Sequence, residues 1–274
     1  MTPNGRLTDL TFRSHALLRP MRLRAYLPPD YEEAREPLPT VYLLHPWGQD
    51  ERWWTDVMRF HQAADHLITM GALPPFVAVM PQGDKSFFIN AANPGGDYQM
   101  LVDFDPDHYA GALDGFGDYG DYLLRDVLDA AERRFPLRRD RRGRVIAGVS
   151  MGGAGAAVLA FTRPDLFCGA GIHSPALFDE TQLGPPWLFG LGDPRAFAER
   201  DPVQLAGRLD PRAGLRIYLD CGQQDDLATR TEALHDALAA RRVQHTYVSR
   251  PGSHTLPYWQ AHLAEYLGFY AAGW

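Results

Sequence analysis

The sequence of 274 residues has few cysteines and almost no lysine, since it holds only Cys168, Cys221 and Lys85. Two cysteines cannot form a disulfide framework, and neither has metal-ligand spacing around it, so we expect both to be small buried hydrophobes. No apolar run approaches the ~20 residues that span a bilayer. The N-terminal stretch Thr8–Pro20 is interrupted by charged residues and lacks the apolar core of a secretory signal. These absences predict a soluble, cytoplasmic protein without a membrane span, or a secreted one if a leader has been removed.

An excess of positive charge is also missing, because the formal net charge is −7. A net acidic chain argues against general nucleic-acid binding. The arginine-rich stretch 138–144 is more typical of a solvated loop before a strand than of a phosphate site. A composition of 45% hydrophobic and 22% charged residues excludes a disordered chain, a collagen and a coiled coil. The remaining class is a globular protein with a large core.

Short apolar runs recur along the chain and alternate with helical patterns. Near-continuous apolar strands are typical of a parallel sheet covered by helices on both faces. The first two runs, near the N-terminus, predict an antiparallel pair at the sheet edge. The predicted strands are Leu10–His15, Met21–Leu27, Thr40–His45, Phe76–Met80, Arg144–Ser150, Cys168–His173, Leu215–Cys221 and His245–Ser249. The predicted helices are Trp54–Met70, Tyr119–Phe135, Gly152–Thr162, Ala228–Arg241 and Pro257–Ala272.

This alternation predicts one α/β domain over residues 1–274, with a mostly parallel, twisted sheet of about eight strands. Two stretches, at about 90–120 and 174–211, lack this alternation of strand and helix patterns. We expect them to be irregular loops that face the functional site. The first contains an acidic spacing that resembles a calcium loop but lacks its glycine and its final glutamate. We expect a solvated acidic loop and no metal or cofactor, with a looser calcium site left open. The acidic residues are Asp103, Asp105, Asp107 and Asp114.

The pattern Gly-x-Ser-x-Gly at residues 148–152 is the sharpest chemical signal in the sequence. It directly follows a predicted strand and directly precedes a predicted helix, which is the setting of a nucleophile elbow. Glycines on both sides leave room for the chain to double back, and a strained turn holds the serine hydroxyl clear of the sheet. We therefore predict that Ser150 is a nucleophile.

A serine hydroxyl is a weak nucleophile until a base removes its proton. His254 lies in a loop directly after the last predicted strand, where such sheets place catalytic groups, and we predict that it is the base. An acid should follow the preceding strand, to orient the imidazole and stabilise its protonated form. Asp225 is preferred there, Asp226 is the alternative, and Asp220 lies at the strand end.

The oxyanion of the reaction needs two backbone N–H donors. One is expected from Met151, the residue after the nucleophile, and the other from the loop after the Thr40–His45 strand. Pro46 has no N–H, so Trp47 is the predicted second donor. His45 is expected to buttress this loop by hydrogen bonds, and it is also a candidate for the substrate pocket. Further candidates for the substrate pocket, with ordinary core packing as the alternative, are Trp54, Phe87, His173 and Trp187.

Together these residues resemble an α/β-hydrolase of the esterase D, feruloyl esterase and mycolyltransferase branch. The segments that carry the resemblance are Leu43–Glu51, Met80–Gly83, Ala147–Gly153, Pro164–Phe167, Asp220–Asp225 and Gly252–His254. The resemblance implies an α/β-hydrolase fold and aligns the acid of that family with Asp225. Pro46 stands where many relatives have glycine. The family includes hydrolases of short acyl, feruloyl, acetyl and formyl-thioester substrates, and also acyltransferases.

The predicted function is that of a serine carboxylesterase, which hydrolyses small acyl esters, sugar-linked or aryl ones included, through an acyl-enzyme. The alternative is an acyltransferase that moves the acyl group to an alcohol or sugar, because the same triad serves both reactions. A third hypothesis is a non-catalytic binding protein on a hydrolase fold. The expected partner is a small-molecule ester, and the sequence indicates no oligomeric state.

Overall fold

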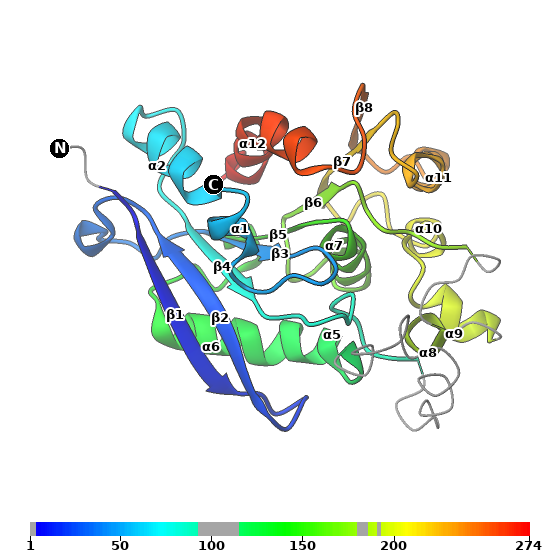
Figure 1. The fold of residues 1–274 in the computed structure, drawn as a ribbon, viewed down its shortest axis with the longest axis horizontal. Helices are drawn as coiled ribbons and strands as arrows, with labels where there is room; N and C mark the ends of the chain where they lie inside the picture. The colour runs from blue at the N-terminus through cyan, green and yellow to red at the C-terminus, as the bar shows by residue number, and fades with distance from the viewer. Residues whose placement is uncertain (1–3, 93–114, 180–185, 191–192) are drawn as a thin grey trace.

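Eight strands form one sheet at the centre of the computed structural model, which describes residues 4–92, 115–179, 186–190 and 193–274 (Figure 1). The strands are β1 (Arg6–Arg13), β2 (Pro20–Leu27), β3 (Thr40–Leu44), β4 (Val77–Pro81), β5 (Arg144–Val149), β6 (Gly169–His173), β7 (Arg216–Gly222) and β8 (Thr246–Arg250). Their order across the sheet is β1-β2-β4-β3-β5-β6-β7-β8. β1 pairs antiparallel with β2 and β2 antiparallel with β4, whereas the pairs from β4 to β8 are parallel. The predicted mostly parallel sheet of an α/β fold is confirmed.

Helices cover both faces of the sheet, because successive residues of a buried strand point to opposite sides. Val41 and Leu43 of β3 belong to one apolar core, and Tyr42 and Leu44 to the other. The first core is closed by α1 (Trp53–Asp56), α2 (Phe60–Thr69) and α12 (Leu256–Ala271). Helices of the second core are α5 (Tyr119–Asp121), the π-helical η3 (Tyr122–Val127), α6 (Leu128–Arg134), α7 (Met151–Thr162), α8 (Pro186–Phe189), α9 (Pro194–Ala198), α10 (Pro202–Ala206) and α11 (Ala228–Ala240).

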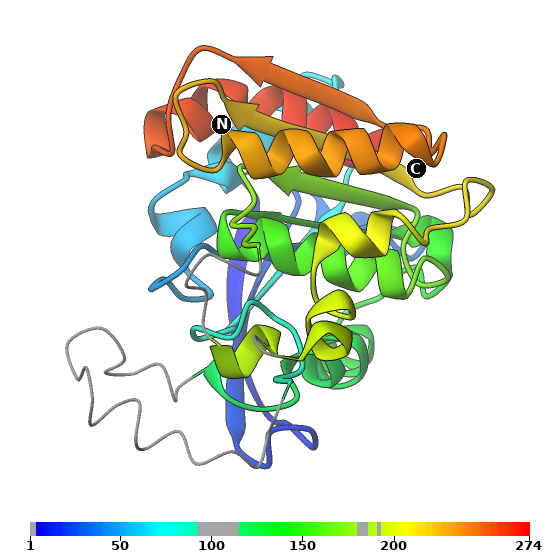
Figure 2. The ribbon, with the colours of Figure 1, turned by 90° about the vertical axis from the view of Figure 1, so that its right-hand side faces the viewer.

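The two views agree on these layers. In Figure 1, α2 and α12 lie above the sheet and α6 lies below it. Figure 2 shows α7 and α11 on the near side of the strands and α12 behind them. Two short 3-10 turns, η1 (Tyr31–Glu33) and η4 (Arg141–Gly143), complete the elements of the described residues.

The predicted helix Trp54–Met70 is wrong as a single element. The chain forms the short α1 and then α2, and Arg59 between them has the left-handed φ of 57°. A non-glycine residue in this conformation cannot continue a right-handed helix. The break separates a turn that packs beneath β3 from a helix that packs near β1.

The expectation of an irregular loop at 174–211 is also wrong in part, because three short helices lie within it. α9 and α10 each begin with a proline, whose fixed φ suits the first helical turn. Asp193 and Asp201 precede them, and their carboxylates accept hydrogen bonds from the first free backbone N–H groups. Local capping therefore orders a stretch that has too little apolar periodicity to be recognised as helical.

Some sequence predictions concern residues 93–114, which lie outside the described part of the chain. The acidic spacing of Asp103, Asp105, Asp107 and Asp114 falls there. Within the described ranges, no three His, Cys, Asp or Glu side chains are grouped so that they could hold a metal ion. None of the helices described so far combines the length and the apolar character needed to cross a membrane.

Close approach of α7 to the sheet positions the functional site. All residues of α7 from Met151 to Phe161 are buried, and most are alanine or glycine. A Cβ at Gly148 would lie 2.2 Å from the carbonyl carbon of Gly152, and a Cβ at Gly152 would lie 2.3 Å from the carbonyl oxygen of Leu44. These two glycines let α7 start directly against β5 and β3, at the carboxyl edge of the sheet.

We expect Gly148→Ala to lower the free energy of unfolding by about 3 kcal/mol, because the added methyl meets backbone that cannot rotate away. Gly268→Ala is the matched control, since a Cβ at this position of α12 would have no neighbour within 4 Å. It should raise stability by about 0.5–1 kcal/mol through helix propensity. Urea unfolding measures both values. A Gly148→Ala protein as stable as the wild type would contradict the close contact between β5 and α7.

Candidate active site

Ser150 occupies a strained turn between β5 and α7. Its φ of 56° and ψ of −117° are unfavourable for a residue with a side chain, and such strain persists only where the surroundings enforce it. The Ser150 N–H donates to the carbonyl of His173 at 2.9 Å, and the Ser150 carbonyl accepts from the N–H of Ala176 at 3.0 Å. The turn is thus fixed by the chain that follows β6.

A line of hydrogen bonds joins Ser150 to His254 and Asp225. The His254 Nε2 lies 2.9 Å from the Ser150 Oγ, and its Nδ1 lies 2.8 Å from the Asp225 Oδ2. A carboxylate only accepts, so Nδ1 carries the proton, and in this tautomer Nε2 can accept from the serine hydroxyl. The three residues come from the loops after β5, β7 and β8. The structure therefore brings together all three residues of the predicted triad.

Asp225 is buried and remains ionised. Burial alone would raise its pKa, but hydrogen bonds from the His254 ring and from the Leu227 N–H outweigh burial, so the pKa of Asp225 lies below its ordinary value. The two other aspartates considered from the sequence lie elsewhere. Asp226 is exposed, and Asp220 is buried against His173, with 2.6 Å between the Asp220 Oδ1 and the His173 Nδ1.

The two predicted oxyanion donors lie at the same edge of the sheet. Trp47 follows β3, and Met151 follows Ser150 at the start of α7. β3 and β5 are neighbours, with Leu44 beside Gly148. The Gln49 N–H donates to the Pro46 carbonyl at 3.2 Å and closes a turn around Trp47. No described residue accepts a hydrogen bond from the backbone N–H of Trp47 or of Met151.

His45 supports this loop from below, as expected from the sequence. Its Nδ1 donates to the Pro46 carbonyl at 3.0 Å, and its Nε2 accepts from the Gly83 N–H at 2.9 Å. The side chain is 1% exposed, and burial lowers the pKa of His45. The neutral ring ties the loop after β3 to the loop after β4, and it is too buried to serve as a substrate-pocket residue.

Among the other pocket candidates, the predictions for Trp54 and His173 are wrong, because both side chains are 0% exposed. The Trp54 Nε1 donates to the Leu44 carbonyl at 3.1 Å, and His173 contacts Asp220 in the core. A buried Trp N–H usually finds a hydrogen-bond partner, and the Leu44 carbonyl is that partner for Trp54. The side chain of Trp187 lies outside the described residues.

Phe87 belongs to an aromatic cluster that includes Trp47, Phe178 and Phe189. Ring centroids lie 5.7 Å apart for Phe87–Trp47, 5.7 Å for Phe87–Phe178 and 5.0 Å for Phe87–Phe189. The indole of Trp47 is 40% exposed, whereas Phe87 and Phe189 are almost fully buried, so Trp47 is the ring of this cluster that is most open to solvent. Phe178 was missed by the sequence reasoning. Phe178 lies four residues beyond Ser174, in the stretch after β6 that was expected to face the site. An aromatic residue in this stretch was the signal that could have identified it.

The two cysteines differ in their surroundings. Burial raises the pKa of the Cys221 thiol to about 12, so the thiol stays protonated, and it is buried as predicted but also hydrogen-bonds to Asp225. Cys168 is only partly buried, and its thiol lies 3.4 Å from the Arg142 carbonyl.

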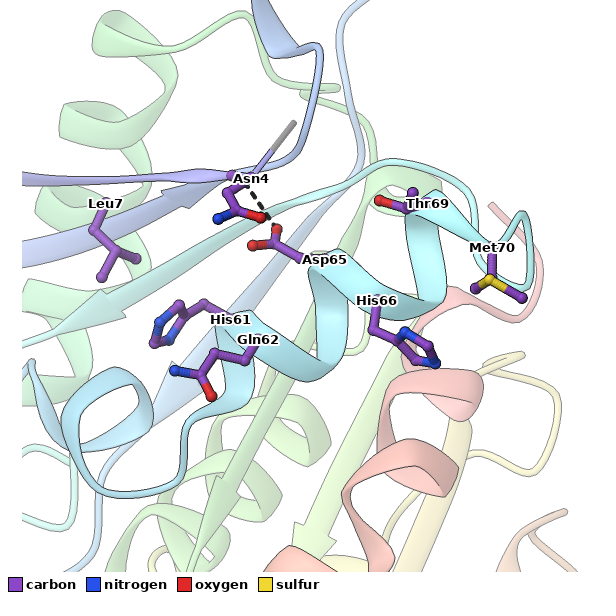
Figure 3. A pocket seen from close by; sticks show the side chains of 9 residues that line it. Asn4, Leu7, His61, Gln62, Asp65, His66, Thr69 and Met70 are labelled. Carbon is purple, nitrogen blue, oxygen red and sulfur yellow. Dashed lines mark hydrogen bonds between the residues drawn. The ribbon is translucent and has the colours of Figure 1, made fainter. Parts of the chain in front are cut away.

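Figure 3 shows a different cavity, of about 630 Å³, between the start of β1 and α2. His61, Gln62 and Asp65 of α2 line it, and Asp65 accepts a hydrogen bond from the Gly5 N–H at 3.0 Å. None of the residues of the predicted triad lines this cavity. It is therefore separate from the candidate active site.

The fold and the strained serine at the strand–helix turn define an α/β-hydrolase of the serine hydrolase class. The chain belongs to the Esterase family, because the sequence pattern of that family, described as "Putative esterase", matches residues 14–270. It is thus an enzyme of the esterase type.

Individual relatives are distant in sequence. An endo-1,4-beta-xylanase/feruloyl esterase from Xylanibacter ruminicola is 24% identical over 199 residues, which cover 69% of this chain and 25% of that protein. An acetyl esterase from Caldicellulosiruptor saccharolyticus is 21% identical, with 94% of this chain and 96% of the relative covered. The chain therefore spans a quarter of the first relative and nearly all of the second. A solved ferulic acid esterase shares the fold, with a TM-score of 0.81 at 21% identity over 100% of both chains.

We expect the pH dependence of stability to contain a contribution from His45. Its folded-state pKa is lowered, so the unfolded chain binds more protons as the pH falls below the ordinary value of 6.5. The stability contributed by the neutral ring is complete above that pH and is lost as the pH falls from there. His45→Gln keeps an acceptor for the Gly83 N–H and does not titrate. Its difference in unfolding free energy from the wild type should narrow from about pH 7 to about pH 5. A difference that stays constant in urea titrations over this range would contradict the buried neutral ring.

Proposed function

We propose that this protein is a serine carboxylesterase in which Ser150, His254 and Asp225 form the catalytic triad. The observation that supports this most directly is the unbroken line of hydrogen bonds from the Asp225 carboxylate through the imidazole to the serine hydroxyl. Membership of the Esterase family agrees with it. Hydrolysis is placed ahead of acyl transfer because the relatives reported above are named esterases.

In the first half of the reaction, the Ser150 Oγ attacks the ester carbonyl carbon while the His254 Nε2 takes the hydroxyl proton. The tetrahedral intermediate collapses, the bond to the alkoxy oxygen breaks, and His254 gives its proton to the leaving alcohol. An acyl-enzyme on Ser150 remains. Water, deprotonated by the same imidazole, attacks the acyl carbon. The bond from that carbon to the Ser150 Oγ then breaks, His254 returns its proton to the serine oxygen, and the acid is released.

Asp225 acts through the imidazole. Its ionised carboxylate holds the tautomer that keeps Nε2 free and stabilises the imidazolium that forms in each half-reaction. Burial matters for this role, because a charge in a region of low dielectric acts more strongly on its neighbour.

Negative charge that develops on the carbonyl oxygen would be stabilised by the backbone N–H groups of Met151 and Trp47. Met151 also lies at the N-terminus of α7, where the helix dipole favours an anion. These donors are part of the backbone, so they need no reorganisation during the reaction.

The substrate class we propose is an ester with a small or aryl acyl group. The exposed indole of Trp47 offers an apolar ring next to the proposed oxyanion donor, and the buried ring of Phe87 packs against it. The names of the two relatives, a feruloyl and an acetyl esterase, bracket the same range of acyl groups.

Ser150→Ala and His254→Ala should each lower kcat on a p-nitrophenyl ester by about 10⁴–10⁶, and Asp225→Asn by about 10³–10⁴. Asp226→Asn is the matched control, because this neighbouring carboxylate is exposed. It should stay within about twofold of the wild type. Ser150→Ala should also lose labelling by a fluorophosphonate. Undiminished turnover in Ser150→Ala would overturn the proposed function.

Trp47→Pro and Trp47→Ala separate the backbone donor from the indole. The turn closed by Pro46 and Gln49 has Gly48 at φ 73° in its third position, which suits a type II turn, and proline is common at the second position. Trp47→Pro therefore fits the turn and removes only the N–H that Trp47→Ala keeps. We expect kcat of Trp47→Pro to be about 10²–10³ below that of Trp47→Ala. Equal kcat values for the two variants would exclude this N–H as an oxyanion donor.

A further inference from the structure

Trp259 contacts the proposed catalytic base directly. Its ring lies edge-to-face on the imidazole of His254, with 5.0 Å between centroids and 89° between planes. Trp259 lies in the first turn of α12 and is 6% exposed, whereas the His254 side chain is 34% exposed. One side of the imidazole is therefore covered by a buried ring, while Nδ1 and Nε2 point to Asp225 and Ser150.

Trp259 is itself held on two sides. Its Nε1 donates to the Ser174 Oγ at 3.1 Å, and Ser174 is completely buried directly after β6. The Ser174 N–H in turn donates to the Asp220 carbonyl at 2.8 Å, which fixes this serine to the end of β7. On its other side, Trp259 packs against Trp53, with 6.0 Å between centroids and 69° between planes.

The contact continues to the loop that follows β3. Trp53 lies edge-to-face on Trp54, with 5.2 Å between centroids. The Trp54 Nε1 donates to the carbonyl of Leu44, the last residue of β3. Three indoles thus form a continuous row, from the strand end that precedes Trp47 to the ring of His254. We call Trp54, Trp53 and Trp259 the indole row.

The start of α12 is also anchored by buried hydrogen bonds. The hydroxyls of Tyr258 and Tyr266 donate to the Asp220 carboxylate at 3.2 and 2.8 Å. Burial raises the pKa of both phenols, so both remain protonated and keep donating. The helix that carries Trp259 therefore has little freedom to shift relative to β7.

We propose that Trp259, held by Ser174 and Trp53, is a positioning residue that sets the orientation of the His254 ring. The Asp225 bond fixes Nδ1, but a single hydrogen bond leaves the ring free to tilt about that contact. The edge-to-face indole removes this freedom and excludes water from that side, so that Nε2 stays directed at the Ser150 Oγ. This role rests on the proposed function of His254.

The test compares Trp259→Leu, Trp259→Phe and Ser174→Ala in the full chain. Small displacements of a catalytic group cost up to about 10²-fold in rate. We expect kcat of Trp259→Leu on a p-nitrophenyl ester to fall by about 10–100-fold, with KM within about twofold. Trp259→Phe and Ser174→Ala both lose the indole–hydroxyl bond, and each should lose about 3–10-fold in kcat. The rate of fluorophosphonate labelling should fall in parallel.

The matched control is Trp274→Leu, the same chemical change beyond the far end of α12, where Trp274 packs on Phe76. It should leave kcat near the wild-type value. All rates are taken per folded molecule, with unfolding midpoints measured for each variant. A merely structural role would lower the midpoint and leave kcat per folded molecule unchanged.

The outcomes separate the two proposals. Retained turnover in Ser150→Ala would overturn the proposed function, and the positioning role with it. An inactive Ser150→Ala together with wild-type kcat and labelling in Trp259→Leu would overturn the positioning role alone. If Trp259→Leu does not fold, Trp259→Phe and Ser174→Ala decide the question, and wild-type kcat in both would reject it.

Discussion

Between β5 and α7 the chain reverses its direction around Ser150, and the space for that turn exists only because Gly148 and Gly152 carry no side chain. The backbone of Ser150 is strained, and hydrogen bonds to His173 and Ala176 hold it there. Everything else at the site is arranged around this point. The loops after β3, β7 and β8 reach it because parallel strands end at the same edge of the sheet.

Buried polar residues at this edge divide into two sets with different roles. His45 and the His173–Asp220 pair have partners on every side and connect loops and strands to one another. The His254 ring is partly exposed, and its Nε2 is hydrogen-bonded to the Ser150 hydroxyl. Within the described ranges, a histidine is hydrogen-bonded to an aspartate in two places, and solvent access distinguishes the pair suited to catalysis from the pair that stabilises the fold.

The sequence predicted a mostly parallel sheet with an antiparallel pair at its edge, and it predicted the position of most elements. It also predicted the three residues that the structure joins by hydrogen bonds. These predictions succeed where the signal is local: apolar runs for strands, periodicity for helices and a glycine-flanked serine for the turn. They fail at Arg59, where a left-handed residue breaks a helix, and at Asp193 and Asp201, where side-chain caps order short helices. They fail also for Trp54 in α1 and His173 at the end of β6, because residue type and position along the chain do not determine whether such a ring faces the core or the solvent.

What the sequence by itself determined is the kind of sheet and the chemical identity of the groups at its edge, because both depend on residue type and order along the chain. Tertiary structure alone decided which rings are buried, and it joined His254 to Asp225, the aspartate preferred from the sequence. It also placed Trp259 against the imidazole and linked it through Trp53 to Trp54. The physical reason is distance in sequence: these contacts join residues of α1 and α12 to residues of the loops after β6 and β8, and only packing in the folded chain brings them together.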